Sequence, residues 1–167
     1  MAELMIVVAV ISIISAIGLR SFSSSYTDRR LRLAAIELAT VLSTARDIAN
    51  KEIPGSNSCR ITQTLTASTT IVVGASQDCS TSSINTPLPT ANLRSVSGLN
   101  NLSVDATRTF TFIYGGFSTN GSDTEQTVRL SDPGTTTQYC VNLTLPSSIV
   151  RVGSAQGASA SNYQSTG

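Results

Sequence analysis

Histidine is absent from this chain, and lysine occurs only once, at Lys51. Without histidine, the sequence lacks the side chain that most readily serves as an acid–base catalyst or a metal ligand near neutral pH. Charged residues make up only 13% of the composition and the formal net charge is +1, which argues against nucleic-acid binding through bulk electrostatic attraction. No Ser-His-Asp set, P-loop or metal-ligand cluster is visible, so the sequence predicts neither an enzyme nor a cofactor or metal site.

An almost uninterrupted apolar run opens the chain. Between Leu4 and Leu19, only two serines and one glycine break the series of aliphatic side chains. A helix over residues 1–19 would be just under ~30 Å long, close to the thickness of the hydrocarbon layer of a bilayer. A cleaved secretory signal has a positive segment before its apolar core, whereas the first basic residue here, Arg20, follows the run. We therefore predict a membrane helix, and a plain membrane anchor is the alternative.

A second helical pattern follows and carries apolar side chains on one face only. Its apolar positions recur every three or four residues from Leu31 to Ala49. Pro54 and Gly55 then end the pattern, because proline excludes the residue before it from helical dihedrals and glycine permits a turn. We expect this face to pack on a sheet through four side chains in particular: Leu31, Leu38, Leu42 and Ala45.

The remainder of the chain has the composition of strands and loops. The clearest strand signal is Thr109–Tyr114, where apolar and polar side chains alternate. Residues 75–98 lack periodicity and are predicted to form a loop. Because the connections are short, the strands should pair antiparallel. The predicted strands are Arg60–Leu65, Thr69–Gly74, Thr109–Tyr114, Gln126–Ser131, Gln138–Leu145 and Ile149–Val152.

These patterns together predict an α+β fold. One long helix, with or without an interruption, should run from Met1 to about Glu52 and pack its amphipathic half on a C-terminal antiparallel β-sheet domain. The predicted parts are a transmembrane or filament-core segment over 1–25, an amphipathic continuation over 26–53, a β domain over 54–153 and a flexible Ser/Gly/Ala-rich tail over 154–167.

Three cysteines are present, at Cys59, Cys79 and Cys140. In a domain outside the cytoplasm at least one pair should oxidise, and the odd number leaves one thiol over. We favour a structural disulfide between Cys59 and Cys79, which flank the first predicted hairpin, with Cys140 as a free thiol. Cys140 is the rival partner for either of the others, because spacing alone does not decide the pairing.

The segment AELMIVVAVISIISAIGLRSF resembles the N-terminal segment of type IV pilins and pseudopilins. Glu3 falls on the glutamate of that family, and the resemblance implies that it guides assembly by pairing with the N-terminal amine of a neighbouring subunit. This chain starts two residues inside the usual mature N-terminus, and Arg20 stands where the family commonly has a proline. The resemblance also implies a helix that packs in a filament core through Leu4, Ile6, Val7, Val8, Val10, Ile11, Ile14 and Ile17.

Later segments resemble the GspH/FimT group of minor pseudopilins. The helical pattern of that group is carried here by Leu38, Leu42, Ala45, Arg46 and Ala49. The segment YCVNLTLPSSIVRVG resembles its closing hairpin, in which Arg151 keeps one arginine of a usual pair. For DNA-uptake members of the group such a hairpin contacts DNA, which makes DNA an alternative partner.

The resemblance implies a structural subunit of a type IV pilus or a related pseudopilus. Its expected partners are copies of itself or other pilin subunits, an inner-membrane assembly platform, a prepilin peptidase and, before assembly, the lipid bilayer. We expect a single-pass inner-membrane protein that becomes part of an extracellular or periplasmic filament. The alternatives are a minor pseudopilin of type II secretion and a membrane-anchored extracytoplasmic binding domain that does not polymerise. Three arginines beside the membrane segment (Arg29, Arg30 and Arg32) either form a solvated turn or bind anionic lipid or DNA.

Overall fold

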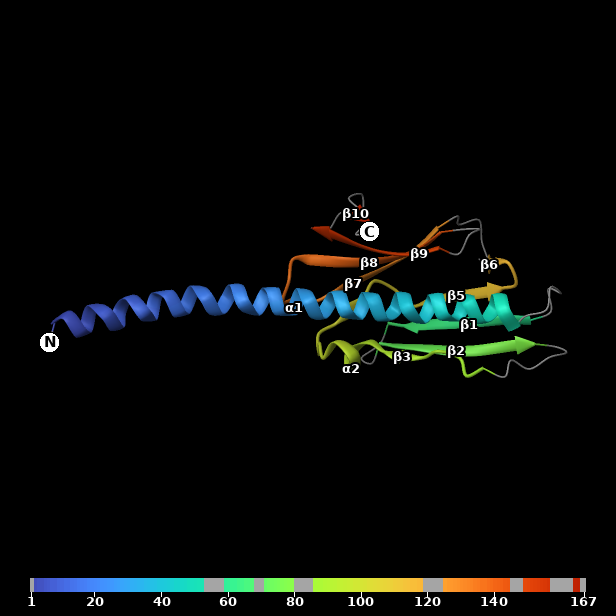
Figure 1. Ribbon diagram of the computed structural model, residues 1–167, viewed down its shortest axis with the longest axis horizontal. Helices are drawn as coiled ribbons and strands as arrows, with labels where there is room; N and C mark the ends of the chain where they lie inside the picture. The colour runs from blue at the N-terminus through green and yellow to red at the C-terminus, as the bar shows by residue number, and fades with distance from the viewer. Residues whose placement is uncertain are drawn as a thin grey trace.

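The computed structural model describes residues 2–52, 59–67, 71–79, 86–118, 125–144, 149–156 and 164–165. Within these ranges the chain begins with one long helix, and a short helix and ten strands follow it. The first half of the long helix extends away from the rest of the molecule, and the second half lies against the strands (Figure 1). The α+β class predicted from the sequence is therefore correct.

Helix α1 spans Ala2–Glu52 without a break. It continues through Arg20, where no proline interrupts it, and through the polar segment 21–28, which would weaken a helix in isolation. In that segment the hydroxyl of Thr27 donates to the Ser23 carbonyl at 3.0 Å, so it is satisfied within its own helix. The predicted single helix is confirmed, and the predicted stop at Pro54 lies outside the described residues.

Two five-stranded sheets, entirely antiparallel, follow α1. The first sheet has the order β3 (Ala91–Asn92), β2 (Val72–Cys79), β1 (Cys59–Thr66), β5 (Arg108–Ile113) and β6 (Gly116–Ser118). The second sheet has the order β10 (Gln164–Ser165), β9 (Ile149–Gln156), β8 (Thr137–Thr144), β7 (Glu125–Ser131) and β4 (Ser103–Val104). The antiparallel pairing is as predicted, whereas the division into two sheets was not foreseen.

Both sheets pack on the second half of α1. The helix contacts β1 and β5 of the first sheet and β7, β8 and β9 of the second, and strands of both sheets lie alongside its second half (Figure 1). Leu31, Leu38 and Leu42 are fully buried in this core, and so is Ala45. The strands contribute the buried side chains Ile61, Leu65, Phe110, Phe112, Val128, Leu130, Tyr139, Val141 and Leu143.

The short helix α2 (Leu93–Ser97) also packs on α1. Asn92 caps its start by accepting a hydrogen bond from the Ser95 amide at 3.1 Å. At its end, Gly98 has φ of 65°, a left-handed conformation that glycine adopts without strain. The Arg30 guanidinium of α1 donates to the Gly98 carbonyl at 3.0 Å, which ties the end of α2 to the long helix.

Two sequence predictions are wrong in this region. The second strand was predicted as Thr69–Gly74, followed by a loop over 75–98, but β2 runs through Cys79 and its residue 74 lies in mid-strand. The glycine there does not mark a turn, since a Cβ added to Gly74 would have only the Thr64 carbonyl nearby, at 4.0 Å. The supposed loop also contains β3 and α2.

The predicted end of the closing strand is also corrected. The closing strand was predicted to end at Val152, yet β9 continues to Gln156 because Tyr139 and Gln138 of β8 still supply strand partners for Ser154 and Ala155. A further short strand, β10, pairs with Gly153 and Ser154 of β9. Small polar side chains therefore do not prevent this stretch from extending the second sheet.

Candidate functional site

The part of α1 that precedes the β domain exposes large apolar side chains. Val10 and Ile14 are 50% and 65% exposed, and the other large apolar side chains described between residues 6 and 14 lie within this range. The exposed set is Ile6, Val7, Val8, Val10, Ile11, Ile13 and Ile14, followed by Phe22 at 73%. Soluble monomers rarely leave an apolar surface of this extent uncovered, so it marks a contact surface. We call this surface, over residues 6–14, the apolar half of α1.

Most residues predicted for a filament core belong to this surface. Ile6, Val7, Val8, Val10, Ile11 and Ile14 are all exposed along it. Leu4 and Ile17 are in the same helix, but their side chains lie outside the described residues. The same is true of Glu3, whose backbone is helical within the first turn of α1.

The apolar half has no charged side chain between Glu3 and Arg20. Its polar group at Ser12 is satisfied internally, because the hydroxyl donates to the Val8 carbonyl at 2.8 Å. This serine can therefore enter an apolar contact without losing a hydrogen bond. Among the residues with described side chains, no helix meets the length and hydropathy needed to cross a membrane.

Asp28 and Arg30 fix the position at which α1 leaves the β domain. The hydroxyl of Tyr139 in β8 donates to the Asp28 carboxylate at 3.3 Å. Burial, together with the neighbouring Asp28 carboxylate, raises the pKa of Tyr139, so this hydroxyl keeps its proton. Arg30 stacks on the Tyr26 ring and donates to its hydroxyl while it also binds the end of α2. The contacts of Asp28 and Arg30 therefore fix the point at which α1 leaves the β domain.

The arginine cluster predicted from the sequence is divided by this arrangement. Arg30 is engaged with Tyr26 and the α2 terminus, whereas Arg29 and Arg32 are exposed. Two exposed cations beside an apolar helix fit both a solvated turn and a contact with anionic groups, so the two interpretations stay open for them. Arg151, the residue weighed for DNA contact, is exposed on β9 and pairs in register with Asn142.

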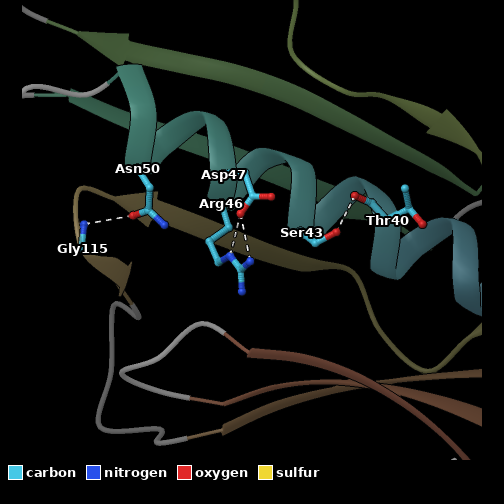
Figure 2. A network of polar contacts seen from close by, with 6 residues as sticks. All are labelled: Thr40, Ser43, Arg46, Asp47, Asn50 and Gly115. Atoms are coloured by element: carbon cyan, nitrogen blue, oxygen red, sulfur yellow. Dashed lines mark hydrogen bonds and ion pairs between the residues drawn. The ribbon is translucent and has the colours of Figure 1, made fainter. Parts of the chain in front are cut away.

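The outer face of α1 becomes polar toward its C-terminal end (Figure 2). Ser43 donates to the Thr40 carbonyl at 3.0 Å, and Arg46 forms an ion pair with Asp47 at 2.9 Å. Asn50 accepts a hydrogen bond at 3.2 Å from the amide of Gly115, the positive-φ residue of the turn between β5 and β6. This end of the helix is solvated, in contrast to the apolar half.

The sequence reasoning missed two exposed apolar residues between these regions. Leu33 and Ile36 are 53% and 43% exposed on the half of α1 that the sheets cover. Both lie off the apolar face that begins at Leu31, so the helical pattern of that face does not include them. The sequence did contain a signal for them. Leu33 and Ile36 are seven and ten residues after Tyr26, so the three side chains lie on one side of a helix.

The cysteines are arranged as the favoured pairing requires. Cys59 and Cys79 are direct partners in the β1–β2 register. Direct partners in an antiparallel pair have Cα atoms about 4.5 or 5.5 Å apart, and a disulfide spans about 4.4–6.8 Å. The side chains of both residues lie outside the described ones. Cys140 is a free, buried thiol, and burial raises its pKa while Arg129 acts in the opposite direction.

Peptide mapping under non-reducing conditions should recover a Cys59–Cys79 linkage and an unmodified Cys140. The closed loop between the two cysteines should add about 3 kcal/mol in the chain-entropy model. Alkylation of the native protein at neutral pH should label Cys140 only after unfolding, because a buried, protonated thiol is a poor nucleophile. A linked peptide that contains Cys140 would contradict the assignment.

Comparisons with known proteins found no relative of this chain. No family model matches the chain, and no curated protein and no solved structure matches it either. Within the described part of the chain there is also no group of three or more His, Cys, Asp or Glu side chains that would hold a metal ion. The candidate site is therefore defined by the exposed surface of α1 alone.

Proposed function

We propose that this chain is a structural subunit of a helical filament of the type IV pilus or pseudopilus kind, and that it polymerises through the apolar half of α1. The observation that carries the proposal is the contrast within one continuous helix. From Ile6 to Ile14 the large apolar side chains that are described are 50–65% exposed. From Leu31 onward, by contrast, one face of the helix is buried by the strands. The domain provides no cover for the first part.

Burial of these side chains supplies the driving force for assembly. A buried Val or Ile contributes roughly 1.5–3 kcal/mol relative to its exposed state, so several such residues on one helix give a large gain when another surface covers them. Lipid tails cover the helix before assembly, and helices of neighbouring subunits replace them in the filament. Because lipid is as apolar as these side chains, the exchange depends on close packing and on paired polar groups.

Glu3 supplies the polar group in this proposal. An ionised carboxylate in an apolar helix is costly unless it is paired, so it favours an arrangement in which a neighbouring subunit offers a positive charge. By resemblance to pilins that charge is an N-terminal amine. The proposed partners are further copies or other pilin subunits, the inner-membrane assembly platform and the prepilin peptidase. The proposed locations are the inner membrane before assembly and a periplasmic or extracellular filament afterwards.

Two other uses of the same architecture remain as alternatives. A minor pseudopilin of type II secretion would use the same helix within a periplasmic pseudopilus. A membrane-anchored binding domain would use the apolar half only to hold the domain at the membrane. The exposed Arg151 on β9 is the residue through which DNA would be an additional partner.

Filament shearing separates these functions. Cells that produce the full chain are sheared, and the filament and membrane fractions are blotted. The wild type is expected in the filament fraction, and Ile11→Asp is expected to be lost from it, because a charge in the middle of the apolar half prevents close helix packing. Thr44→Asp, on the exposed outer face of the domain-covered half, serves as the matched control and should be incorporated normally. Wild type that is confined to the membrane fraction would favour the anchored binding domain.

A further inference from the structure

A pocket lies at the place where α1 leaves the β domain. The turn between β7 and β8 reaches the long helix there (Figure 1), and the two enclose a hollow of about 380 Å³. This volume is within the range of small-molecule sites, about 300–1,000 Å³. We call it the turn pocket, and its lining residues are Ser23, Ser24, Pro133, Gly134, Thr135 and Thr136.

One wall of the turn pocket is a tight turn that packs on the helix. A Cβ added at Gly134 would lie 3.3 Å from the Thr27 methyl group and 3.0 Å from the Asp132 carboxylate. That carboxylate accepts a hydrogen bond from the Gly134 amide at 2.8 Å, and the Thr135 amide donates to the Asp132 carbonyl at 3.2 Å. These contacts fix the turn against α1, so the pocket is preformed.

Two carboxylates lie beside the turn pocket. Asp132 is 7% exposed and directly precedes the lining residue Pro133, and Asp28 follows Ser24 by about one helical turn. In the part of the chain that the structure describes, Oδ2 of Asp132 and Oδ1 of Asp28 are buried without a hydrogen-bond partner. Neither residue is in an ion pair with another described residue. Carboxylates whose charge is not paired attract a cation to the pocket through their field.

The lining of the turn pocket favours one kind of cation. The described residues that line it include no aromatic side chain to enclose a quaternary ammonium, and no Lys or Arg to bind a phosphate. A calcium ion takes about six to eight oxygen ligands, and no group of three or more acidic side chains is found among the described residues. Four of the six lining residues carry a hydroxyl group, which accepts hydrogen bonds. A primary ammonium group has three N–H donors and matches this lining.

The position of the pocket along α1 indicates the source of the ammonium group. Ser23 and Ser24 come shortly after Leu19, the last residue of the apolar run, at a distance of about 6–7.5 Å along a helix axis. The head-group layer on each side of a bilayer is about as deep, roughly 5–7.5 Å. With the apolar run in a membrane, the pocket is at the level of the lipid head groups. Arg20 comes one helical turn before Ser24, toward the side on which the phosphate of such a lipid lies.

We infer that the turn pocket binds the primary ammonium head group of phosphatidylethanolamine, between Ser23 and Ser24 of α1 and the threonines of the β7–β8 turn. This inference rests on the proposed function, because it requires the apolar half of α1 to be in lipid before assembly. The bound head group contacts both the helix and the turn. It therefore sets how the β domain stands on the bilayer.

Lipid retention by the full chain tests the inference. The chain is reconstituted in vesicles of equal parts phosphatidylethanolamine, phosphatidylcholine and phosphatidylglycerol, and flotation checks its insertion. The vesicles are then dissolved in mild detergent, and native mass spectrometry counts the lipids that stay bound. We expect phosphatidylethanolamine in excess over the other two lipids.

One pair of variants tests the charge beside the pocket. Asp132→Asn keeps an acceptor for the Gly134 amide but removes a negative charge, so it should lower the excess about fivefold, the effect of one partly screened charge. Glu37→Gln is the matched control, because it removes a half-buried carboxylate from α1 away from the pocket. It should leave the excess unchanged.

A second pair of variants tests the space in the pocket. Ser24→Leu fills it and should abolish the excess, whereas Ser25→Leu adds the same side chain at an exposed position outside the lining and should retain it. Circular dichroism checks that both variants fold. Soluble phosphoethanolamine at a concentration equal to that of the lipid should not displace it, because α1 holds the lipid at a high local concentration.

The outcomes are distinguishable. A chain that does not float with the vesicles would contradict the proposed membrane location and the inference with it. A chain that floats without an excess of phosphatidylethanolamine, or a folded Ser24→Leu variant that keeps the excess, would overturn the inference and leave the proposed function intact. Displacement by soluble phosphoethanolamine would overturn the assignment of the pocket to a membrane lipid.

Discussion

Leu38→Ala is expected to lower the free energy of unfolding of the domain by about 2–5 kcal/mol. Leu38 is fully buried, and it lies on the helix face that both sheets cover. Its removal leaves a cavity that a helix packed on two sheets cannot easily close. A loss of this size is a large part of the roughly 5–15 kcal/mol by which small domains are stable. Urea titration of the full chain in detergent, followed by circular dichroism, measures it.

The matched control is Leu33→Ala in the same helix. Leu33 is 53% exposed, so the same chemical change should alter the free energy of unfolding by no more than about 0.5 kcal/mol. An unchanged midpoint for Leu38→Ala, or equal losses for the two variants, would mean that the covered face of α1 does not hold the sheets together.

Glu3→Ala is expected to abolish entry into filaments while the domain remains folded. Breaking a buried charge pair costs about 3–5 kcal/mol, which corresponds to more than about a hundredfold weaker association. The expectation depends on the resemblance of the first helix to pilins and on the isolation of this carboxylate in an apolar run. Blots of sheared filaments and of membranes should show the variant in membranes alone.

Glu37→Ala is a suitable comparison for that experiment. Glu37 is an acid of the same helix, half-buried beside the domain and remote from the apolar half. Its loss should leave incorporation unchanged, since it is outside the apolar half of α1. Normal incorporation of Glu3→Ala would remove the proposed role of this carboxylate, and the helix would then have to assemble by apolar packing alone.

The long helix could be predicted because its two signals are strong and continuous. The all-round apolar run and the one-sided pattern from Leu31 to Ala49 both have helical spacing, and nothing between them forces a break. The strand predicted over Thr109–Tyr114 was similarly readable from its alternation, and in the structure it is Arg108–Ile113. The apolar half followed directly from the sequence, because its run of aliphatic side chains is apolar all round.

Other parts of the fold were not readable from local patterns. The strands Ala91–Asn92 and Ser103–Val104 have two residues each, too few to show a period. Gly115 forms a turn with φ of 78°, and the next strand begins at once at Gly116 and has only three residues. The sheet that a strand joins depends on tertiary packing, which alternation does not encode.

The packing of α1 on two separate sheets has a consequence for synthesis. The helix leaves the ribosome first, but β8 and β9 of the second sheet follow roughly a hundred residues later, which corresponds to about 5–20 s of translation. During that interval the buried face of α1, which includes Leu31, Leu38 and Leu42, lacks the cover of the second sheet. A nascent chain whose apolar half is already held at the membrane keeps this face apart from other unfinished chains. Attachment at the membrane would then protect the domain from aggregation before it serves any filament.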